Sequence, residues 1–447
     1  MRKPSMPVRR ARRTNTPGGA AVERANPLAP PVGTRDLVPP EAAARRALIR
    51  RIASVLELHG YELVTTPPFE RGEIVERGLG AADPRDTLRF VDPETSEVSV
   101  FRPDLTLQIA RVVATRLVDR PAPLRLFYEG HVIRTRRGRA RRQRQIAQIG
   151  AECIGIAGPT GDAEVVSVAS RALDAARLDH RIEIAIVPLV RDLINAVEPT
   201  RRPEVTEALG RKDVSALQTA LEAAPIPKAV RRALLALPAL TGDAGVLNEA
   251  HRALRGTSAS AHVARVRALH HELCARGLGD RVRFDLGEVR GFDYYTGPSF
   301  SLLAEGPGEP LGGGGRYDDL VGRFGRATPA TGFAIDIDHV AWAMHVQGHQ
   351  LPQESQHRVC VVGRGRHAES SADALRALGV CVAVLPDASR DEARSYARAW
   401  GLDAAVEPRG GGPCQVWWPG AAHAEACAPN ELRARIEARR AREEQRS

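Results

Sequence analysis

The chain has 447 residues, which predicts two or three domains, and 43% of them are apolar, which is ample material for a core. No apolar run approaches the roughly 18 residues of a membrane span, and no secretory h-region follows the first charges, so we expect a soluble, cytoplasmic protein. The net charge is +10, but residues 1–30 carry +6 of it, so the basic character belongs mainly to a tail and does not predict a nucleic-acid surface.

Residues 1–32 are rich in Arg, Pro, Ala and Gly without periodicity, and we expect a disordered basic tail. The six cysteines show no CxxC spacing and no clustering with histidine, so we expect buried free thiols and neither disulfides nor metal ligands. His270 and His271 have no third ligand at metal spacing and are interpreted as surface residues. Nothing in the sequence indicates a cofactor.

Ordered structure is expected to begin at Gly33. Leu48, Ile52 and Leu56 recur at helical spacing together with Val55, and this helix is expected to end at Gly60. Residues 61–70 follow as a β-rich run that contains Pro67 and Pro68, and proline predicts an edge strand followed by a turn.

Residues 88–92 and 98–102 predict a pair of strands, after which Asp104 precedes a helix. That helix should bury Leu105, Ile109 and Val113. Asp is a favoured N-cap residue, so capping alone is a sufficient reason for Asp104 at this position.

Two further strands, at 124–129 and 146–155, enclose a loop dense in arginine. Such a loop is either solvated or bound to an anionic partner. A strand at 180–188 then leads into a helical stretch, residues 197–255, which carries no residue pattern that indicates chemistry.

The stretch from 290 to 317 concentrates polar and aromatic groups. It holds three of the chain's six tyrosines, beside Arg290, Arg316 and Asp293, and a run of four glycines at 312–315. Arginine can pair with a carboxylate at two points, and glycines let backbone approach a ligand or turn at positive φ. These groups suit a pocket for a small zwitterion such as an amino acid, while a glycine-rich hairpin with solvated charges is the alternative.

Residues 357–447 alternate strand and helix, which predicts a small α/β domain. Arginines and acids balance between His357 and Asn430, and an RNA-binding module normally has a basic excess. The helix after Pro429 is rich in Arg and Glu and is interpreted as solvent-facing.

RGFDYYTG at 290–297 followed by GGGGRYD at 312–318 resembles the histidine-recognition motifs of histidyl-tRNA synthetase and its non-catalytic relatives. The resemblance implies an α+β fold of the class II synthetase type, an antiparallel sheet flanked by helices. It divides the chain into core residues 33–196 and 256–350, a helical insertion at 197–255 and the C-terminal domain at 357–447. The segment around Pro67 resembles motif 1, which implies a homodimer.

The same resemblance implies the residues of a histidine site. Arg290 would hold the carboxylate of L-histidine, Asp104 and Thr106 would face its ammonium, and other side chains would surround its imidazole. The full set of candidate binding residues is Asp104, Thr106, Arg134, Gln148, Glu152, Arg290, Tyr294, Tyr295 and Tyr317.

The chain departs from active synthetases where ATP would bind. Arg136 stands where a glutamate meets adenine, His339 where an arginine holds the γ-phosphate, and Asp336 where a glycine lies. Removing one preorganised electrostatic donor typically costs roughly 10²–10³ in rate, so we expect neither adenylation nor any catalytic residue.

RPDLT at 102–106 also resembles the regulatory subunits of ATP phosphoribosyltransferase. This resemblance implies a non-catalytic subunit in histidine biosynthesis whose partner, in a hetero-oligomer, is the short-form catalytic subunit. The alternatives are an active histidyl-tRNA synthetase and a stand-alone pseudo-enzyme.

Overall fold

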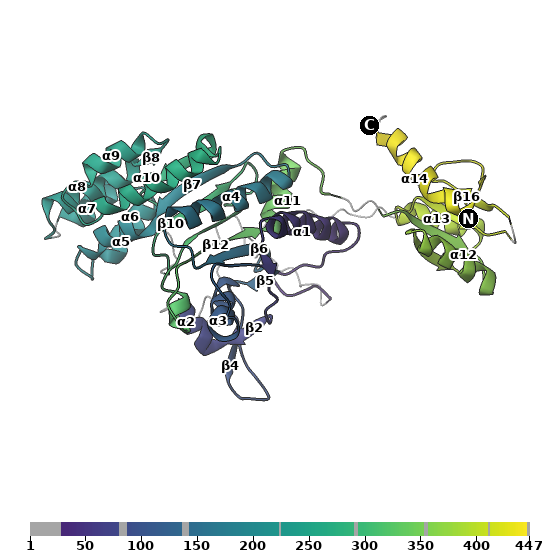
Figure 1. Ribbon diagram of the computed structural model, residues 1–447, viewed down its shortest axis with the longest axis horizontal. Coiled ribbons are helices and arrows are strands. Elements are labelled where there is room, and N and C mark those ends of the chain that lie inside the picture. Colours follow the sequence, from purple (N-terminus) through teal and green to yellow (C-terminus); the bar gives the residue numbers. More distant parts are fainter. Residues whose placement is uncertain are drawn as a thin grey trace, which may run out of the picture. The chain divides into compact units, whose positions relative to one another are not determined.

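Two units make up the chain, residues 1–351 and residues 352–447, and each is described by itself. The computed structural model describes residues 28–79, 87–135, 143–222, 225–289, 294–352, 356–409 and 412–444 (Figure 1). Residues 1–27 of the predicted tail lie outside these ranges. Within the described ranges no helix has the length and apolarity that crossing a bilayer requires. The domain boundaries expected inside the first unit, near 196 and 255, stay predictions.

A mixed nine-stranded sheet is the centre of the first unit. Its middle strands pair antiparallel, and only the β1–β5 and β7–β9 pairs, nearer the edges, are parallel. In spatial order the strands are β1 (Glu62–Leu63), β5 (Leu124–Ile133), β6 (Gln145–Ile154), β12 (Ala330–Asp336), β11 (Gly312–Arg316), β10 (Pro298–Leu303), β7 (Arg181–Ile186), β9 (Val282–Asp285) and β8 (Thr241–Gly242).

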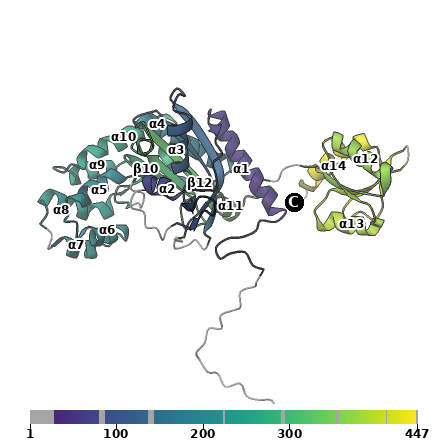
Figure 2. The same cartoon turned by 90° about the horizontal axis from the view of Figure 1, so that it is seen from below.

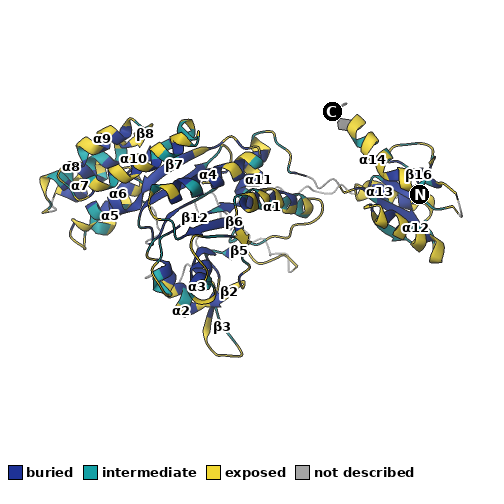
Figure 3. Cartoon of the chain, in the orientation of Figure 1, coloured by how far each residue is buried: buried dark blue, intermediate teal, exposed yellow. Residues whose placement is uncertain are grey.

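Helices α1 (Glu41–Leu58), α4 (Pro159–Ala175), α10 (Ser260–Ala275) and α11 (Ile337–Val346) pack on one face of this sheet (Figures 1 and 3). The predicted stripe of α1 is confirmed, because Leu48, Ile52 and Leu56 are fully buried against the inward side chains of the strands. Gly60 follows the C-cap with φ +79°, a conformation that glycine adopts without strain. This face is therefore an apolar core.

The opposite face carries α2 (Gly72–Leu79), α3 (Thr106–Arg116) and a three-stranded sheet of β2 (Phe69–Arg71), β4 (Val98–Phe101) and β3 (Arg89–Val91). The predicted strand pair is confirmed, with Val91 opposite Val98. The β-rich run at 61–70 is shorter in strand than expected, because only β1 and the start of β2 pair with neighbours. The apolar cluster on this face includes Leu105, Ile109, Tyr128 and Tyr317, the residue that directly follows β11.

The stretch expected to be helical is helical, and Figures 1 and 2 both place it at one end of the first unit. A two-residue strand, β8, also attaches this stretch to the edge of the large sheet, with Thr241 opposite Asp285. Its helices are α6 (Arg202–Gly210), α7 (Val214–Glu222), α8 (Lys228–Ala236) and α9 (Val246–Ala253), and α5 (Val187–Asn195) precedes it directly after β7.

The second unit is a five-stranded sheet in the order β14-β13-β15-β16-β17 with helices α12 (Gly365–Ala377), α13 (Arg390–Ala399) and α14 (Pro429–Glu444). The expected alternation of strand and helix is present, and β17, which was not predicted, pairs with β16. The strands are β13 (Arg358–Val362), β14 (Cys381–Leu385), β15 (Ala404–Glu407), β16 (Cys414–Trp417) and β17 (Glu425–Cys427).

Helix α14 corrects the interpretation of a wholly solvent-facing helix. Leu432 and Ile436 are each 1% exposed and pack into the core of the second unit. These two residues are four positions apart and so lie on one side of the helix, where they are the apolar positions in a segment otherwise rich in Arg and Glu.

Candidate functional site

Glu152 is the centre of the predicted site. Side chains alternate along β6, so Ile149, Ala151 and Cys153 enter the apolar core while Glu152 points to the α3 side. Glu152 is 1% exposed, and three hydroxyls bond to its carboxylate. Thr106 Oγ1 donates to Oε1 at 2.8 Å, Tyr128 OH donates to Oε1 at 3.2 Å, and Tyr317 OH donates to Oε2.

Burial raises the pKa of Glu152 to about 8, because desolvation disfavours the carboxylate more than the hydroxyl donors stabilise it. The group is therefore largely protonated at neutral pH. A bound cation or N–H donor would favour the carboxylate form.

Asp104 and Tyr294 make a second bonded pair close to the first. Tyr294 OH donates to Asp104 Oδ2 at 3.2 Å, and Asp104 Oδ1 accepts from the backbone N–H of Thr106 at 2.7 Å. The capping contact that the sequence suggested is thus present, and the second carboxylate oxygen meets the tyrosine of the RGFDYYTG motif. Asp104, Thr106 and Glu152 consequently form one connected network.

The three tyrosines of the motifs lie together. The rings of Tyr294 and Tyr295 have centroids 5.0 Å apart, and Tyr294 meets Tyr317 edge-on at 5.8 Å. Each is at most 6% exposed. Arg191 Nη1, from α5, donates to the carbonyl of Tyr295 at 3.2 Å, so α5 also contacts this motif.

The remaining predicted residues are located by their strands and by their neighbours. Gln148 lies on the same face of β6 as Glu152, four residues before it, and is 9% exposed. Arg134 follows β5, and its Nε donates to the carbonyl of Pro103 at 3.2 Å. Arg290 lies outside the described residues, as does Arg136 in the arginine-rich loop.

The glycine run forms strand β11, in the middle of the sheet, and none of its residues has a positive φ. Of the two alternatives for this run, the turn at positive φ is not what the structure shows. A Cβ on any of Gly312, Gly313, Gly314 or Gly315 would come within 3.0 Å of a backbone oxygen on β10 or β12. The glycines therefore allow close strand packing and leave backbone without side chains on the site face.

Two residues of the motifs have other tasks. Arg316 turns to the opposite side of β11, where Nε bonds to Asp162 Oδ1 and Nη1 to Asp318 Oδ1, both at 2.8 Å. Desolvation raises the pKa of Asp162 to about 6 in spite of that arginine. This buried ion pair is structural.

Tyr128 belongs to the Glu152 network and was missed by the sequence analysis. Its alternation with Leu126 and Val132 along β5 places it on the same face of the sheet as Glu152.

The end of the site at residues 336–339, where ATP would bind in a synthetase, is built differently. Asp336 is the N-cap of α11, and its Oδ1 accepts from the backbone N–H of Asp338 at 2.9 Å and of His339 at 3.2 Å. The imidazole of His339 lies 2.8 Å from the carbonyl of Pro310, measured from Nδ1. Asp336, which stands where active synthetases have a glycine, therefore caps a helix through Oδ1.

Within the described ranges no group of three or more His, Cys, Asp or Glu could hold a metal ion. His270 stacks edge-on with Phe284 at 5.4 Å, as a packing residue would. The cysteines are free, but Cys274 and Cys381 are exposed, so the expectation that all six are buried was wrong. Both residues lie at the ends of elements, Cys274 near the C-terminus of α10 and Cys381 at the start of β14.

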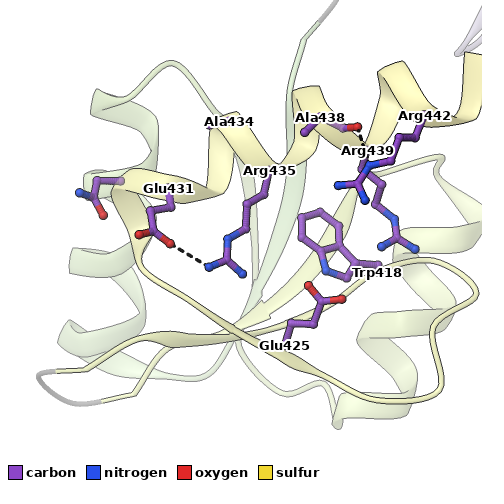
Figure 4. Close-up of a pocket in the computed structure, with 9 residues that line it drawn as sticks. Trp418, Glu425, Glu431, Ala434, Arg435, Ala438, Arg439 and Arg442 are labelled. Carbon is purple, nitrogen blue, oxygen red and sulfur yellow. Dashed lines mark hydrogen bonds and ion pairs between the residues drawn. The ribbon is translucent and has the colours of Figure 1, made fainter.

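A hollow of about 630 Å³ in the second unit lies beside α14 (Figure 4). Arg435 there bonds to Glu431 at 2.9 Å, and the guanidinium of Arg439 lies 5.3 Å from the Trp418 ring centroid. Acidic and basic side chains thus pair within this hollow, and it contains none of the predicted site residues.

Three comparisons with known proteins bear on this geometry. A sequence model of the histidyl-tRNA synthetase family matches residues 33–340. A protein named ATP phosphoribosyltransferase regulatory subunit from Geobacter sulfurreducens is 37% identical over 69% of this chain and 71% of its own length. Another with the same name, from Moorella thermoacetica, is 36% identical over 84% of this chain and 97% of its own.

Solved structures share the fold. The regulatory subunit/histidyl-tRNA synthetase structure from Bacillus halodurans matches with a TM-score of 0.73 and 26% identity, over 85% of this chain and 98% of that one. Apo histidyl-tRNA synthetase from Staphylococcus aureus matches with a TM-score of 0.62 at 19% identity, over 92% of this chain and 99% of that one. The predicted class II synthetase-like α+β fold is confirmed.

Proposed function

Because the chain belongs to the family of ATP phosphoribosyltransferase regulatory subunits, built on the histidyl-tRNA synthetase fold, we propose that it acts in the first step of histidine biosynthesis and senses histidine there. Its relatives carry the name of a regulatory subunit, which supports a non-catalytic role over the alternative of an active ligase. A catalytic ATP phosphoribosyltransferase subunit is its partner. We further propose that this partner is the short form, which lacks a regulatory domain, and that the complex works in the cytoplasm.

The network at Glu152 is the observation that carries the ligand proposal. A buried carboxylate with three hydroxyl neighbours can accept from an imidazole N–H, and Asp104 beside it can accept from an ammonium. Both groups belong to histidine. Arg290 would hold the ligand's carboxylate in this scheme, Arg134 and Gln148 would border the site, and Tyr295 would pack against the ring.

Regulation follows if histidine binds one arrangement of the complex more tightly than the other. A ligand shifts an equilibrium only by its differential affinity for the two states, typically about 1–3 kcal/mol. Histidine that favours an inhibited arrangement would therefore lower the activity of the partner in proportion to that difference.

An aromatic cluster supports a homodimer within the hetero-oligomer. Phe90 meets Phe69 at 5.5 Å and Phe101 at 5.3 Å on the small sheet that follows the Pro67 segment. Phe69 is 41% exposed and Phe101 is 37% exposed, and such grouped apolar surface commonly marks an interface. We propose that a second copy of the chain covers it.

One preparation tests the proposal. The full chain, co-expressed with a short-form catalytic subunit, is purified through a tag on the partner, its mass is measured, and histidine is titrated by calorimetry into the complex and into the chain alone. We expect co-purification, histidine binding, and no histidine-dependent exchange of pyrophosphate into ATP. Absence of histidine binding in both samples would remove the sensing role, and exchange at an enzymatic rate would restore the ligase.

A further inference from the structure

The central strands of the large sheet have two unlike faces. Toward α1 and α4 they present Ile149, Phe300, Leu302, Phe333 and Ile335, all in one apolar cluster. On the opposite face the register aligns four residues across β6, β12, β11 and β10, in the order Glu152, Gly332, Gly315 and Ser299. Residues paired across antiparallel strands point to the same side of the sheet. This row therefore has polar side chains at its two ends and bare backbone between them.

Ser299 is the residue of this row that has no structural task. It is 1% exposed, and among the described residues its Oγ has no hydrogen-bond partner. A buried hydroxyl without a partner is unfavourable, and native proteins rarely keep one unless something else meets it. Its place in the same row as Glu152 indicates what could meet it.

The spacing of the row suits a single small ligand. A Cβ on Gly332 would overlap the Glu152 carboxylate, so that carboxylate leans over Gly332 toward Ser299. Ser299 lies two strands further on than Gly332, roughly 10 Å at the usual strand separation, and Gly315 is the residue of the row between these two. A molecule bound at Glu152 would lie over Gly315 and extend toward Ser299.

We propose that Ser299 is a ligand-binding residue, whose hydroxyl donates to the α-carboxylate of the bound amino acid. The carboxylate is the group expected at this end, because Glu152 and Asp104 place acceptor oxygens at the other end, which suit the N–H groups of the ligand and not its carboxylate. A neutral hydroxyl that bonds to a carboxylate forms a charge-assisted bond, stronger than a neutral pair. This inference rests on the proposed histidine site and adds a residue to it.

The test compares Ser299→Ala with wild type by calorimetry of the full chain, using histidine and histidinol, which lacks the carboxylate. We expect the Kd for histidine to rise about 10-fold or more in Ser299→Ala, and the Kd for histidinol to stay unchanged. The midpoint of urea unfolding should be unchanged or higher, because the variant removes an unpaired buried hydroxyl. Ser301→Ala, on the same face one row away, is the matched control and should leave both affinities unchanged.

Several outcomes would overturn the inference. Equal histidine affinity in Ser299→Ala and wild type would remove Ser299 from the site, and equal losses for histidine and histidinol would remove its assignment to the carboxylate. If Ser299→Ala does not fold, Ser299→Cys, a near-isosteric and poor donor, is held to the same criteria. Wild type that binds neither ligand would refute the proposed function itself, which is a different result from a silent variant.

Discussion

The two ends of the predicted site satisfy their polar groups in different ways. At Glu152 side chains bond to side chains, since the hydroxyls of Thr106, Tyr128 and Tyr317 all converge on one carboxylate. At residues 336–339 side chains bond to backbone, since Asp336 caps α11 and the His339 ring bonds to the carbonyl of Pro310. Both ends are buried.

This difference in bonding decides which end can bind a ligand. Hydroxyls around a carboxylate can rotate and exchange one partner for another, so a ligand can enter the network at small cost. A cap bonded to two backbone N–H groups is part of the helix, and recruiting it for a ligand would expose the helix start. We call the Glu152 end the responsive end, because its hydrogen bonds can be exchanged for bonds to a ligand. We call the Asp336 end the scaffold end, because its side chains hold the start of α11.

The largest expected effect is a pH dependence that belongs to the responsive end alone. The pKa of Glu152 is about 8 in the folded protein and near 4.5 in the unfolded chain. Between these values the folded state holds a proton that the unfolded state has lost, so the free energy of unfolding falls as pH rises, by up to about 1.4 kcal/mol for each pH unit. Urea unfolding of wild type and Glu152→Gln from pH 5 to pH 9 measures it.

Glu152→Gln resembles the protonated group and should lack this slope. We expect the variant to match wild type near pH 5 and to exceed its stability increasingly up to about pH 8. If the free energy of unfolding changes with pH equally in the two proteins, burial does not raise the pKa of Glu152. The two ends of the site would then not differ in how they respond to pH.

The next effect is on binding. Glu152→Gln should raise the Kd for histidine by about 10- to 150-fold at pH 8, because hydrogen bonds to charged groups contribute about 1.5–3 kcal/mol. Glu164→Gln is the matched control, since Glu164 bonds to Arg125 at 2.7 Å on the other face of the sheet. Calorimetry should show normal affinity in the control, and equal affinity in both variants would contradict the assignment of Glu152.

The sequence predicted more of the fold than of the site. Periodicity located α1 and the strands around the arginine loop, because burial of one face dictates the spacing of apolar residues. It could not show that Arg316 pairs with Asp162 of α4, 154 residues earlier in the chain, although Arg316 stands next to the predicted binding residue Tyr317. The role of Asp336 as an N-cap could not be predicted either, because an aspartate suits both helix capping and ligand binding. Such tasks are set by contacts between distant segments, which spacing does not encode.

The smallest expected effect lies at the scaffold end. Asp336→Ala should lower the free energy of unfolding of the first unit by about 1 kcal/mol, the usual value of an N-cap, and should leave histidine affinity unchanged. Asp336→Ser, which can still accept from the backbone of α11, should recover most of the loss. Urea unfolding and calorimetry on the three proteins separate the two readings of this residue. A variant that keeps its stability but changes histidine affinity would place Asp336 in the ligand site, and the two ends would then work as one.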